Sequence, residues 1–470
     1  MGKITKQKTR EIIEDFVKEI EKVRIESSPP KQTVINFRKE DKDRKPRPIY
    51  EVPIELLRYR KDNGRISSDV LNYEKDNGLL TEEAEETQQI IRKFLEEKDD
   101  KKTDELRRLI EHDGQRDPAI ITCDGFLING NRRKMVFEGL LERFPGDVRF
   151  KTMKVVILPG EGDEGGAPTL LEIEEIENRY QLQSEGKADY SAFDRALSMR
   201  HKMEIGMSLE AQLRDDPLYA NRPSKEFKKA VDDFMDKFLR PLECIDKYLS
   251  ALKRDGHYST VSTGLGDPEG RWQAFLDYSN YLDKKLDDPK ECMKLHIEEN
   301  EVGKIEDIAF KIIRMRQVRG LPGITKVHDV MRKMHKWLRN EDSKKELLRL
   351  VDIPLGLPKE ERTDDKGRLF SERVIDTIWA QKHSAIINGQ LKKAINHFEH
   401  KKEQETPIEL LRTALMKLDH KDMRADSVKI TLITEAMKLT ERIQKRAKEI
   451  GSELFNYKKE CDKFKQTYRK

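Results

Sequence analysis

The sequence predicts an α+β protein, in which a small mixed αβ domain is followed by a mainly α-helical C-terminal region. Short apolar runs rich in β-prone residues occur between about residues 49 and 182, separated by Gly or Asp turns. Beyond residue 183, apolar residues recur mainly at helical spacing. A chain of 470 residues is too long for one core, so we expect four parts. Their ranges are 1–48, 49–182, 183–300 and 301–470.

The composition excludes some classes of protein. Hydrophobic residues make up 36% and charged residues 39%, which is polar but enough to fill several small helical cores. The 93 Lys and Arg residues nearly balance 89 Asp and Glu, so a surface that binds nucleic acid has to be local. The four cysteines show no metal-ligand spacing, and no signal peptide or membrane span is evident. We therefore expect a cytoplasmic protein without a membrane association.

The N-terminal elements follow from local patterns. Residues 1–48 form a charged arm whose apolar spacing, as at Phe16 and Ile20, predicts one amphipathic helix. Residues 80–112 predict one or two charged helices inserted into the αβ domain. The acidic, glycine-rich segment 159–168 predicts an exposed loop.

Prolines and polar stretches predict the boundaries in the helical region. Pro241 is expected to close or kink the helix that carries Phe227 and Phe238. Thr406, Pro407 and Glu409 have the pattern of a capping box that starts a new helix. Further breaks are expected in three segments. They are 266–270, 321–323 and 358–368.

The chemistry is expected in the segment Ala119 to Leu141. Two apolar runs flank Asp124-Gly125, a pair that favours a tight hairpin turn. The second run leads directly into Gly130, after which Asn131 opens a helical pattern. The segment therefore predicts a strand, a glycine turn and a helix N-terminus.

A helix N-terminus presents unpaired N–H groups and a positive partial charge, so it favours an anion. Arg132 and Arg133 oppose that partial charge, unless a phosphate binds between the helix end and a guanidinium. The alternative is that both arginines extend into water or pair with Asp124 and Glu138. The residues alone leave both interpretations open.

Three segments in this order resemble the ParB/sulfiredoxin superfamily over about residues 49–200. Val52 to Ile66 resembles its first motif, and GQRDPAIITCDGFLINGNRRKM, which contains Gly130, its second. Ile176 to Gln181 (IENRYQ) resembles its third. The resemblance implies a nucleotide-binding domain of mixed αβ fold.

The resemblance also implies roles for individual residues and two ligands, Mg²⁺ and a nucleoside triphosphate such as CTP or ATP. Glu177 and Asn178 would hold the Mg²⁺, and Glu177 would orient a hydrolytic water as the catalytic residue. The residues implied to contact the nucleotide are Asn63, Arg65, Gly130, Asn131, Arg132, Arg133 and Asn178.

Some positions depart from the family pattern. Asn131 replaces a glutamate that is usual in chromosome-partitioning members, and Gln181 lies one residue late because Tyr180 takes its place. Both changes weaken the case for hydrolysis more than the case for phosphate binding. The phosphate loop lacks the catalytic cysteine of sulfiredoxin, which disfavours reduction of a sulfinic acid.

Partition-type relatives carry a DNA-binding helical module after the nucleotide domain. Residues 201–216 resemble the opening of a helix-turn-helix, but Asp215 and Asp216 lie where a reading helix would need basic or polar side chains. A later basic stretch could neutralise phosphates without base preference, or it is an ordinary charged surface. Its proposed DNA contacts are Arg314, Arg316, Arg319, Lys326, Arg332 and Lys333.

The leading hypothesis is a ParB-like nucleotide-binding protein that acts on or with DNA as a weak Mg²⁺-dependent NTPase switch. Partition, a mobile element and phage defence are all compatible contexts. One alternative is a ParB-like nuclease that cleaves DNA, although no compact two-metal cluster is evident. The other is a noncatalytic interaction protein with a vestigial phosphate pocket. Expected partners are DNA, another protein or a second copy in a homodimer.

Overall fold

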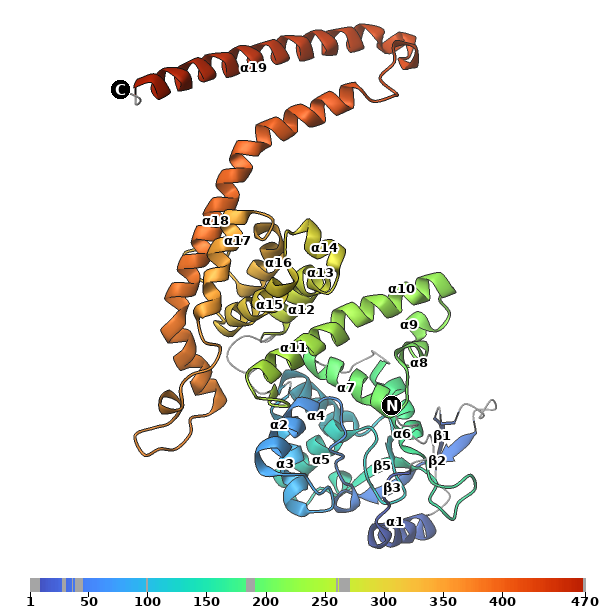
Figure 1. Ribbon diagram of the computed structural model, residues 1–470. Helices are drawn as coiled ribbons and strands as arrows, with labels where there is room; N and C mark the ends of the chain where they lie inside the picture. The colour runs from blue at the N-terminus through green and yellow to red at the C-terminus, as the bar shows by residue number, and fades with distance from the viewer. Residues whose placement is uncertain are drawn as a thin grey trace. The chain divides into compact units, whose positions relative to one another are not determined.

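The structure is a computed structural model that describes residues 9–27, 31–35, 37–38, 45–98, 100–182, 191–258, 261 and 271–467. The chain divides into two compact units, Met1–Asn396 and His397–Lys470. Among the described residues, all strands lie in the N-terminal third, and helices form the rest (Figure 1). The α+β class with a mainly helical C-terminal region is therefore confirmed.

The central sheet has three strands in the order β3-β5-β4. β3 pairs with β5 antiparallel, with Val52 opposite Met153, whereas β4 pairs with β5 parallel, with Ile120 opposite Val156. A separate antiparallel pair joins β1 and β2. The strands are β1 (Gln32–Val34), β2 (Pro46–Pro48), β3 (Tyr50–Pro53), β4 (Ala119–Ile121) and β5 (Thr152–Ile157).

Both faces of this sheet are covered, because its strands alternate between two cores. Ala119 and Ile121 pack in a core with Phe137 and Leu140 of α5, whereas Ile120 packs in another with Ile176 of α6. The N-terminal arm adds Ile20 of α1 to the first core. The helices are α1 (Glu14–Glu26), α2 (Ser67–Asn77), α3 (Glu85–Glu96), α4 (Asp100–Asp113), α5 (Asn131–Arg143) and α6 (Leu170–Leu182).

The predicted charged helices within 80–112 are α3 and α4. The predicted arm helix is shorter than the apolar pattern, since α1 begins at Glu14 and the chain before residue 9 lies outside the described residues.

The rest of the first unit is helical. Its helices as far as α14 are α7 (Ala192–Glu204), α8 (Leu209–Arg214), α9 (Pro217–Ala220), α10 (Ser224–Phe234), α11 (Arg240–Ala251), α12 (Trp272–Tyr278), α13 (Lys284–Leu286) and α14 (Pro289–Lys294). They are followed by α15 (Glu299–Arg314), α16 (Val327–Trp337), α17 (Glu341–Leu348) and the start of α18 (Glu372–Leu418). The expected breaks at 321–323 and 358–368 lie between these helices, and the break at 266–270 lies outside the described residues.

Pro241 does not close its helix. A π-helical turn over Met235–Leu239 leads from α10 straight into α11, where Pro241 occupies the first turn. A proline inside a helical path lacks an N–H and crowds the carbonyl four residues before it, and a π-helical turn at that point changes the hydrogen-bond register. The wider turn therefore lets a helical path continue where the sequence predicted an end or a kink.

A buried ionic cluster joins four segments of the helical region. Asp376 of α18, which is 1% exposed, accepts hydrogen bonds from Arg254 at 2.8 Å, Arg271 at 2.7 Å and Arg314 at 3.0 Å. Arg316 lies 3.9 Å from the same carboxylate. Burial raises the pKa of Asp376, but the arginines outweigh it and lower the pKa to about 2. Asp376 thus stays ionised and holds these segments together.

The second unit contains the C-terminal part of α18 and α19 (Ile433–Thr467). The predicted capping box at Thr406 and Pro407 is wrong, because α18 continues through Pro407 to Leu418. Pro407 is exposed, so water can reach the backbone around it and replace the hydrogen bond that the proline removes. No helix among the described residues combines the length and apolarity needed to cross a membrane.

Candidate phosphate-binding site

The segment around Asp124-Gly125 forms the hairpin that the sequence predicted. The Gly125 N–H donates to the Thr122 carbonyl at 3.0 Å, and the Thr122 N–H donates to the Phe126 carbonyl at 2.9 Å. The Asp124 carboxylate accepts hydrogen bonds from the Thr122 hydroxyl at 2.5 Å and from Arg10 at 2.7 Å. Asp124 therefore braces the hairpin and ties it to the N-terminal arm.

Gly130 turns the chain from this hairpin into α5. It has a φ of 90° in the left-handed region, which side chains other than glycine rarely adopt. A Cβ atom at this position would lie 2.7 Å from the Cβ of Ala119 on β4. Only glycine therefore lets the N-terminus of α5 lie so close to the sheet, and the predicted strand, glycine turn and helix N-terminus are confirmed.

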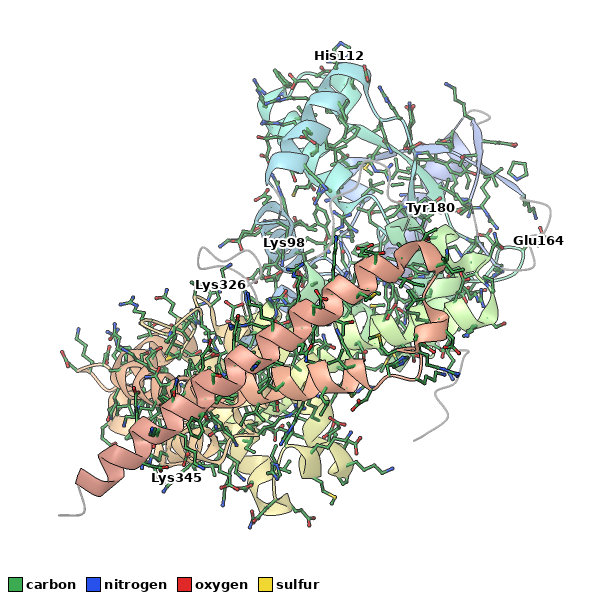
Figure 2. All side chains as sticks on the ribbon, turned by 90° about the horizontal axis from the view of Figure 1, so that it is seen from above. Lys98, His112, Glu164, Tyr180, Lys326 and Lys345 are labelled. Atoms are coloured by element: carbon green, nitrogen blue, oxygen red, sulfur yellow. The ribbon has the colours of Figure 1, made fainter. Side chains whose placement is uncertain are left out.

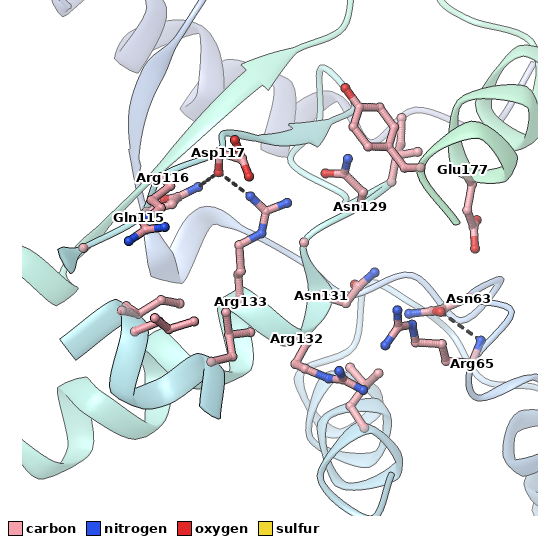
Figure 3. Close-up of a pocket in the computed structure, with 18 residues that line it drawn as sticks. Asn63, Arg65, Gln115, Arg116, Asp117, Asn129, Asn131, Arg132, Arg133 and Glu177 are labelled. Atoms are coloured by element: carbon pink, nitrogen blue, oxygen red, sulfur yellow. Dashed lines mark hydrogen bonds between the residues drawn. The ribbon is translucent and has the colours of Figure 1, made fainter. Parts of the chain in front are cut away.

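A pocket of about 400 Å³ opens at this helix N-terminus (Figure 3). Seven of the residues that line it are sequence-predicted site residues: Asn63, Arg65, Gly130, Asn131, Arg132, Arg133 and Glu177. They come from the loop before α2, from the start of α5 and from α6, so the fold gathers side chains that are far apart in the sequence.

The polar side of the pocket is strongly cationic. Arg65, Arg116, Arg132 and Arg133 all line it, against the carboxylates of Asp117 and Glu177. Arg133 donates to the carbonyl of Asp117 rather than to a carboxylate, as Figure 3 shows. Burial lowers the pKa of the Arg133 guanidinium. A bound anion would offset that cost, because an opposite charge favours the ionised form.

The alternative interpretation was that Arg132 and Arg133 pair with Asp124 and Glu138. The contacts of these two carboxylates test it. Asp124 pairs with Arg10, and Glu138 accepts hydrogen bonds from Tyr59 at 2.5 Å and from Lys134. Arg133 instead contacts Asp117, so at Arg133 this part of the alternative is wrong.

Two amide groups in the pocket have buried atoms without a hydrogen-bond partner. Asn131 is 8% exposed, and its Oδ1 atom is buried and unpaired. The Nδ2 atom of Asn129 is also buried and unpaired, while its Oδ1 atom accepts from the Ile120 N–H at 2.8 Å. Buried polar atoms normally have hydrogen-bond partners, and a water molecule or a polar ligand would satisfy these two. An asparagine amide offers either a donor or an acceptor, depending on its orientation.

Apolar side chains line the pocket as well. Leu106, Leu109 and Ile110 of α4 line it together with Leu95 of α3. The helices inserted at 80–112 thus form a wall of the pocket, which the sequence did not reveal. The pocket lining therefore combines cationic and apolar side chains.

Glu177 and Asn178 have different surroundings, although they are neighbours on α6. Glu177 lines the pocket and is 6% exposed, and it accepts a hydrogen bond from the Gly64 N–H at 3.3 Å. Burial, with repulsion from Glu174, raises the pKa of Glu177 to about 7. The Asn178 amide instead donates to the Gln212 carbonyl at 3.0 Å and accepts from Lys202 at 3.4 Å. Asn178 is not among the residues that line this pocket.

These positions fit a phosphate more closely than a protein-held metal. Mg²⁺ prefers oxygen ligands and usually takes several of them from phosphates and water. Glu177 and Asn131 both line the pocket, although the Oδ1 atom of Asn131 is itself buried. Within the described ranges, no group of three or more His, Cys, Asp or Glu side chains is arranged to hold a metal ion.

The proposed DNA contacts have different environments. Arg314 is 1% exposed in the Asp376 cluster, so its side chain does not lie on the protein surface, and Arg316 is partly exposed beside it. Arg332 forms an ion pair with Asp277 at 2.6 Å. The three remaining residues, Arg319, Lys326 and Lys333, are exposed.

Sequence reasoning missed Asn129, Tyr180 and the wall of α4. Asn129 directly precedes Gly130, and that adjacency was the available signal. The apolar residues of α4 had none, since their spacing predicts a helix but not what the helix covers. The chain matches no family model, no curated protein and no solved structure, so the ParB/sulfiredoxin resemblance stays a prediction.

Proposed function

We propose that the αβ part binds a nucleoside triphosphate, with the phosphates at the N-terminus of α5. The observation that carries this proposal is the convergence of that N-terminus and four arginines on one pocket. Helix N–H groups and guanidinium groups both bind phosphate oxygens. This is the ligand that the resemblance to the ParB/sulfiredoxin superfamily also implies.

The pocket suggests how the two ends of the nucleotide bind. Arg132 and Arg133 face the polyphosphate, and Mg²⁺ is held mainly by the phosphates, with Glu177 and Asn131 as protein oxygen donors. The apolar side chains of α4 cover the nucleoside, whose ring has apolar faces. CTP and ATP both fit this division, and the chemistry of the phosphate end does not distinguish them.

Glu177 is the group best suited to act on a water molecule. A carboxyl with a pKa near 7 is poised to accept a proton at neutral pH. The Glu177 carboxylate is buried and lies 3.6 Å from the Arg60 guanidinium, and both features restrict its movement. We therefore propose slow hydrolysis, in which binding rather than turnover dominates.

The pocket is connected to the first helices of the helical region. Lys202 of α7 lowers the pKa of Glu177 by its charge and contacts Asn178, and Asn178 in turn binds the carbonyl of Gln212 on α8. Lys98, which lies just after α3 and is labelled in Figure 2, forms ion pairs with Asp69 at 2.8 Å and with Asp194 of α7 at 3.1 Å. A nucleotide that changes the charge around Glu177 therefore shifts the equilibrium between arrangements of α7.

Removing the pocket arginines tests nucleotide binding. We expect Arg132→Ala and Arg133→Ala each to weaken the binding of fluorescent CTP or ATP by roughly 10- to 100-fold, because each removes charge-assisted hydrogen bonds. Arg143→Ala is the matched control, since Arg143 lies on the same helix and its side chain is 58% exposed. Equal affinities in the two pocket variants and the control would contradict the proposal.

We also propose that the helical region binds DNA through the exposed cations Arg319, Lys326 and Lys333. Binding to duplex DNA should weaken as salt rises, and neutralising all three residues should reduce the salt slope by about three. Substitution of three exposed lysines on α19, Lys438, Lys445 and Lys459, is the matched control. An unchanged slope after the first triple substitution would exclude this surface.

A further inference from the structure

A strict heptad pattern runs along α19. Its positions alternate in steps of three and four residues over the described part of the helix. They are Ile433, Ala436, Thr440, Ile443, Ala447, Ile450, Leu454, Tyr457 and Cys461. A repeat of 3.5 residues keeps one seam on the same side of a supercoiled helix, and four consecutive heptads are typical of a coiled coil.

In the described part of the second unit, the large side chains of this seam are exposed. Ile433 is 43% exposed, Ile443 44%, Leu454 54% and Tyr457 68%. Side chains of this size are usually buried, and a continuous exposed stripe of them marks an interaction surface.

The neighbouring helix α18 offers too little surface to cover the seam. Among the side chains of α18 that the structure describes in this unit, exposed apolar residues follow the same spacing from Ile408 to Leu418. That stretch is about 15 Å long at 1.5 Å per residue, whereas the seam from Ile433 to Cys461 is about 42 Å long. A helix with a seam of equal length is needed, and α19 of a second copy supplies one.

The charges beside the seam select a parallel orientation. With Ile433 and Cys461 at a positions, Glu453 takes a g position and Lys458 the following e position. In a parallel pair, a g residue lies beside the next e residue of the partner helix, so Glu453 and Lys458 attract one another twice across the twofold axis. An antiparallel pair instead places g beside g, which removes both attractions.

From these features we infer that α19 forms a parallel, in-register, two-stranded coiled coil with α19 of a second copy of this chain. The occupant of the exposed seam is therefore the same seam. The protein is a homodimer held by its second unit. This inference is independent of the nucleotide, because no residue of α19 lines the pocket.

Cys461 provides a direct test of orientation and register. In the parallel coil the two Cys461 residues face each other at an a position, within the Cα separation that a disulfide spans. Diamide treatment of the full-length protein, with diamide accepting two electrons and two protons from the two thiols, should give a covalent dimer. Cys461→Ser should abolish it, because the other three cysteines are buried. A noncovalent dimer that does not cross-link would overturn the parallel register.

Substitutions on α19 test the seam itself by light scattering and sedimentation. Ile450→Asp should raise the dimer dissociation constant by at least 100-fold, because it places two charges in the seam. Ser452→Asp is the matched control, since Ser452 lies on the exposed opposite side and its substitution should leave the dimer intact. A monomeric wild type, or a dimer that Ile450→Asp leaves intact, would overturn the inference.

Exchanging the charges of Glu453 and Lys458 distinguishes a loss of helix pairing from a loss of helix folding. Glu453→Lys alone and Lys458→Glu alone place like charges beside each other and should each weaken the dimer about tenfold. The double variant should regain most of the affinity, but not the ion pair that Glu453 forms with Arg446 of its own helix at 3.3 Å. Failure of the double variant to recover, with helicity unchanged by circular dichroism, would overturn the parallel arrangement. Capture of a different protein by monomeric chain would overturn it as well.

Discussion

Gly130→Ala is expected to destabilise the αβ part strongly, although it adds only one methyl group. The residue has a φ of 90°, and a side chain in the left-handed region costs about 1 to 2 kcal/mol. The new Cβ would lie 2.7 Å from Ala119 Cβ and 3.3 Å from Met153 Cε. Such overpacking costs about 1 to 3 kcal/mol. The free energy of unfolding should therefore fall by roughly 2 to 5 kcal/mol, the sum of these two costs.

Gly139→Ala is the matched control on the same helix. Gly139 lies in the interior of α5, and nothing lies within 4 Å of a Cβ atom placed there. This substitution should raise the stability by about 0.4 to 1 kcal/mol, because alanine loses less conformational entropy in a helix. Urea denaturation followed by circular dichroism measures both. If Gly130→Ala unfolds at the same urea concentration as the wild type, the reasoning about the turn is wrong.

Two further predictions concern buried carboxylates. Asp376→Asn should lower the free energy of unfolding by about 3 to 5 kcal/mol at pH 7, because it leaves buried arginines without their shared counter-ion. The folded pKa of Asp376 is about 2, so the wild type should lose this extra stability over the variant as the pH falls from about 4 to 2. Chemical denaturation measures the free energy of unfolding of both proteins, and a difference that does not change with pH would contradict the prediction. For Glu177→Gln the pH dependence of the stability difference should have the opposite sign. The raised pKa of Glu177 makes the wild type lose stability as the pH rises from about 5 to 7, so the variant should gain relative to it over that range, and a pH-independent difference would count against the assignment.

The elements that the sequence predicts correctly are those set by local chemistry. Gly130 requires its left-handed turn, Asp124-Gly125 favours a hairpin, and both lie within a few residues of the strand that they follow. The gathering of Arg132 and Arg133 with Asn63 was expected only from the family resemblance, because the segments are distant in the chain. Local signals thus located the glycine turn before α5 but not the whole pocket.

Tertiary contacts account for what the sequence did not predict. Arg314 belongs to a basic stretch, but Asp376, 62 residues later, draws it into the interior. Prolines normally end or kink helices, but Pro241 and Pro407 do not end theirs. A wider π-helical turn precedes Pro241, and water can reach the backbone around Pro407. The apolar wall of α4 depends on where an inserted helix packs, which periodicity does not specify.

Nucleotide binding at the N-terminus of α5 is tested most directly by competition at the wild-type pocket. Labelled CTP and ATP are bound in the presence of Mg²⁺, and unlabelled inorganic triphosphate or the unphosphorylated nucleoside is then added. Since arginines and helix N–H groups supply most of the attraction, triphosphate should displace the label and the nucleoside should displace little of it. Absence of binding by any nucleotide, or displacement by nucleoside but not by triphosphate, would contradict a site that recognises phosphate.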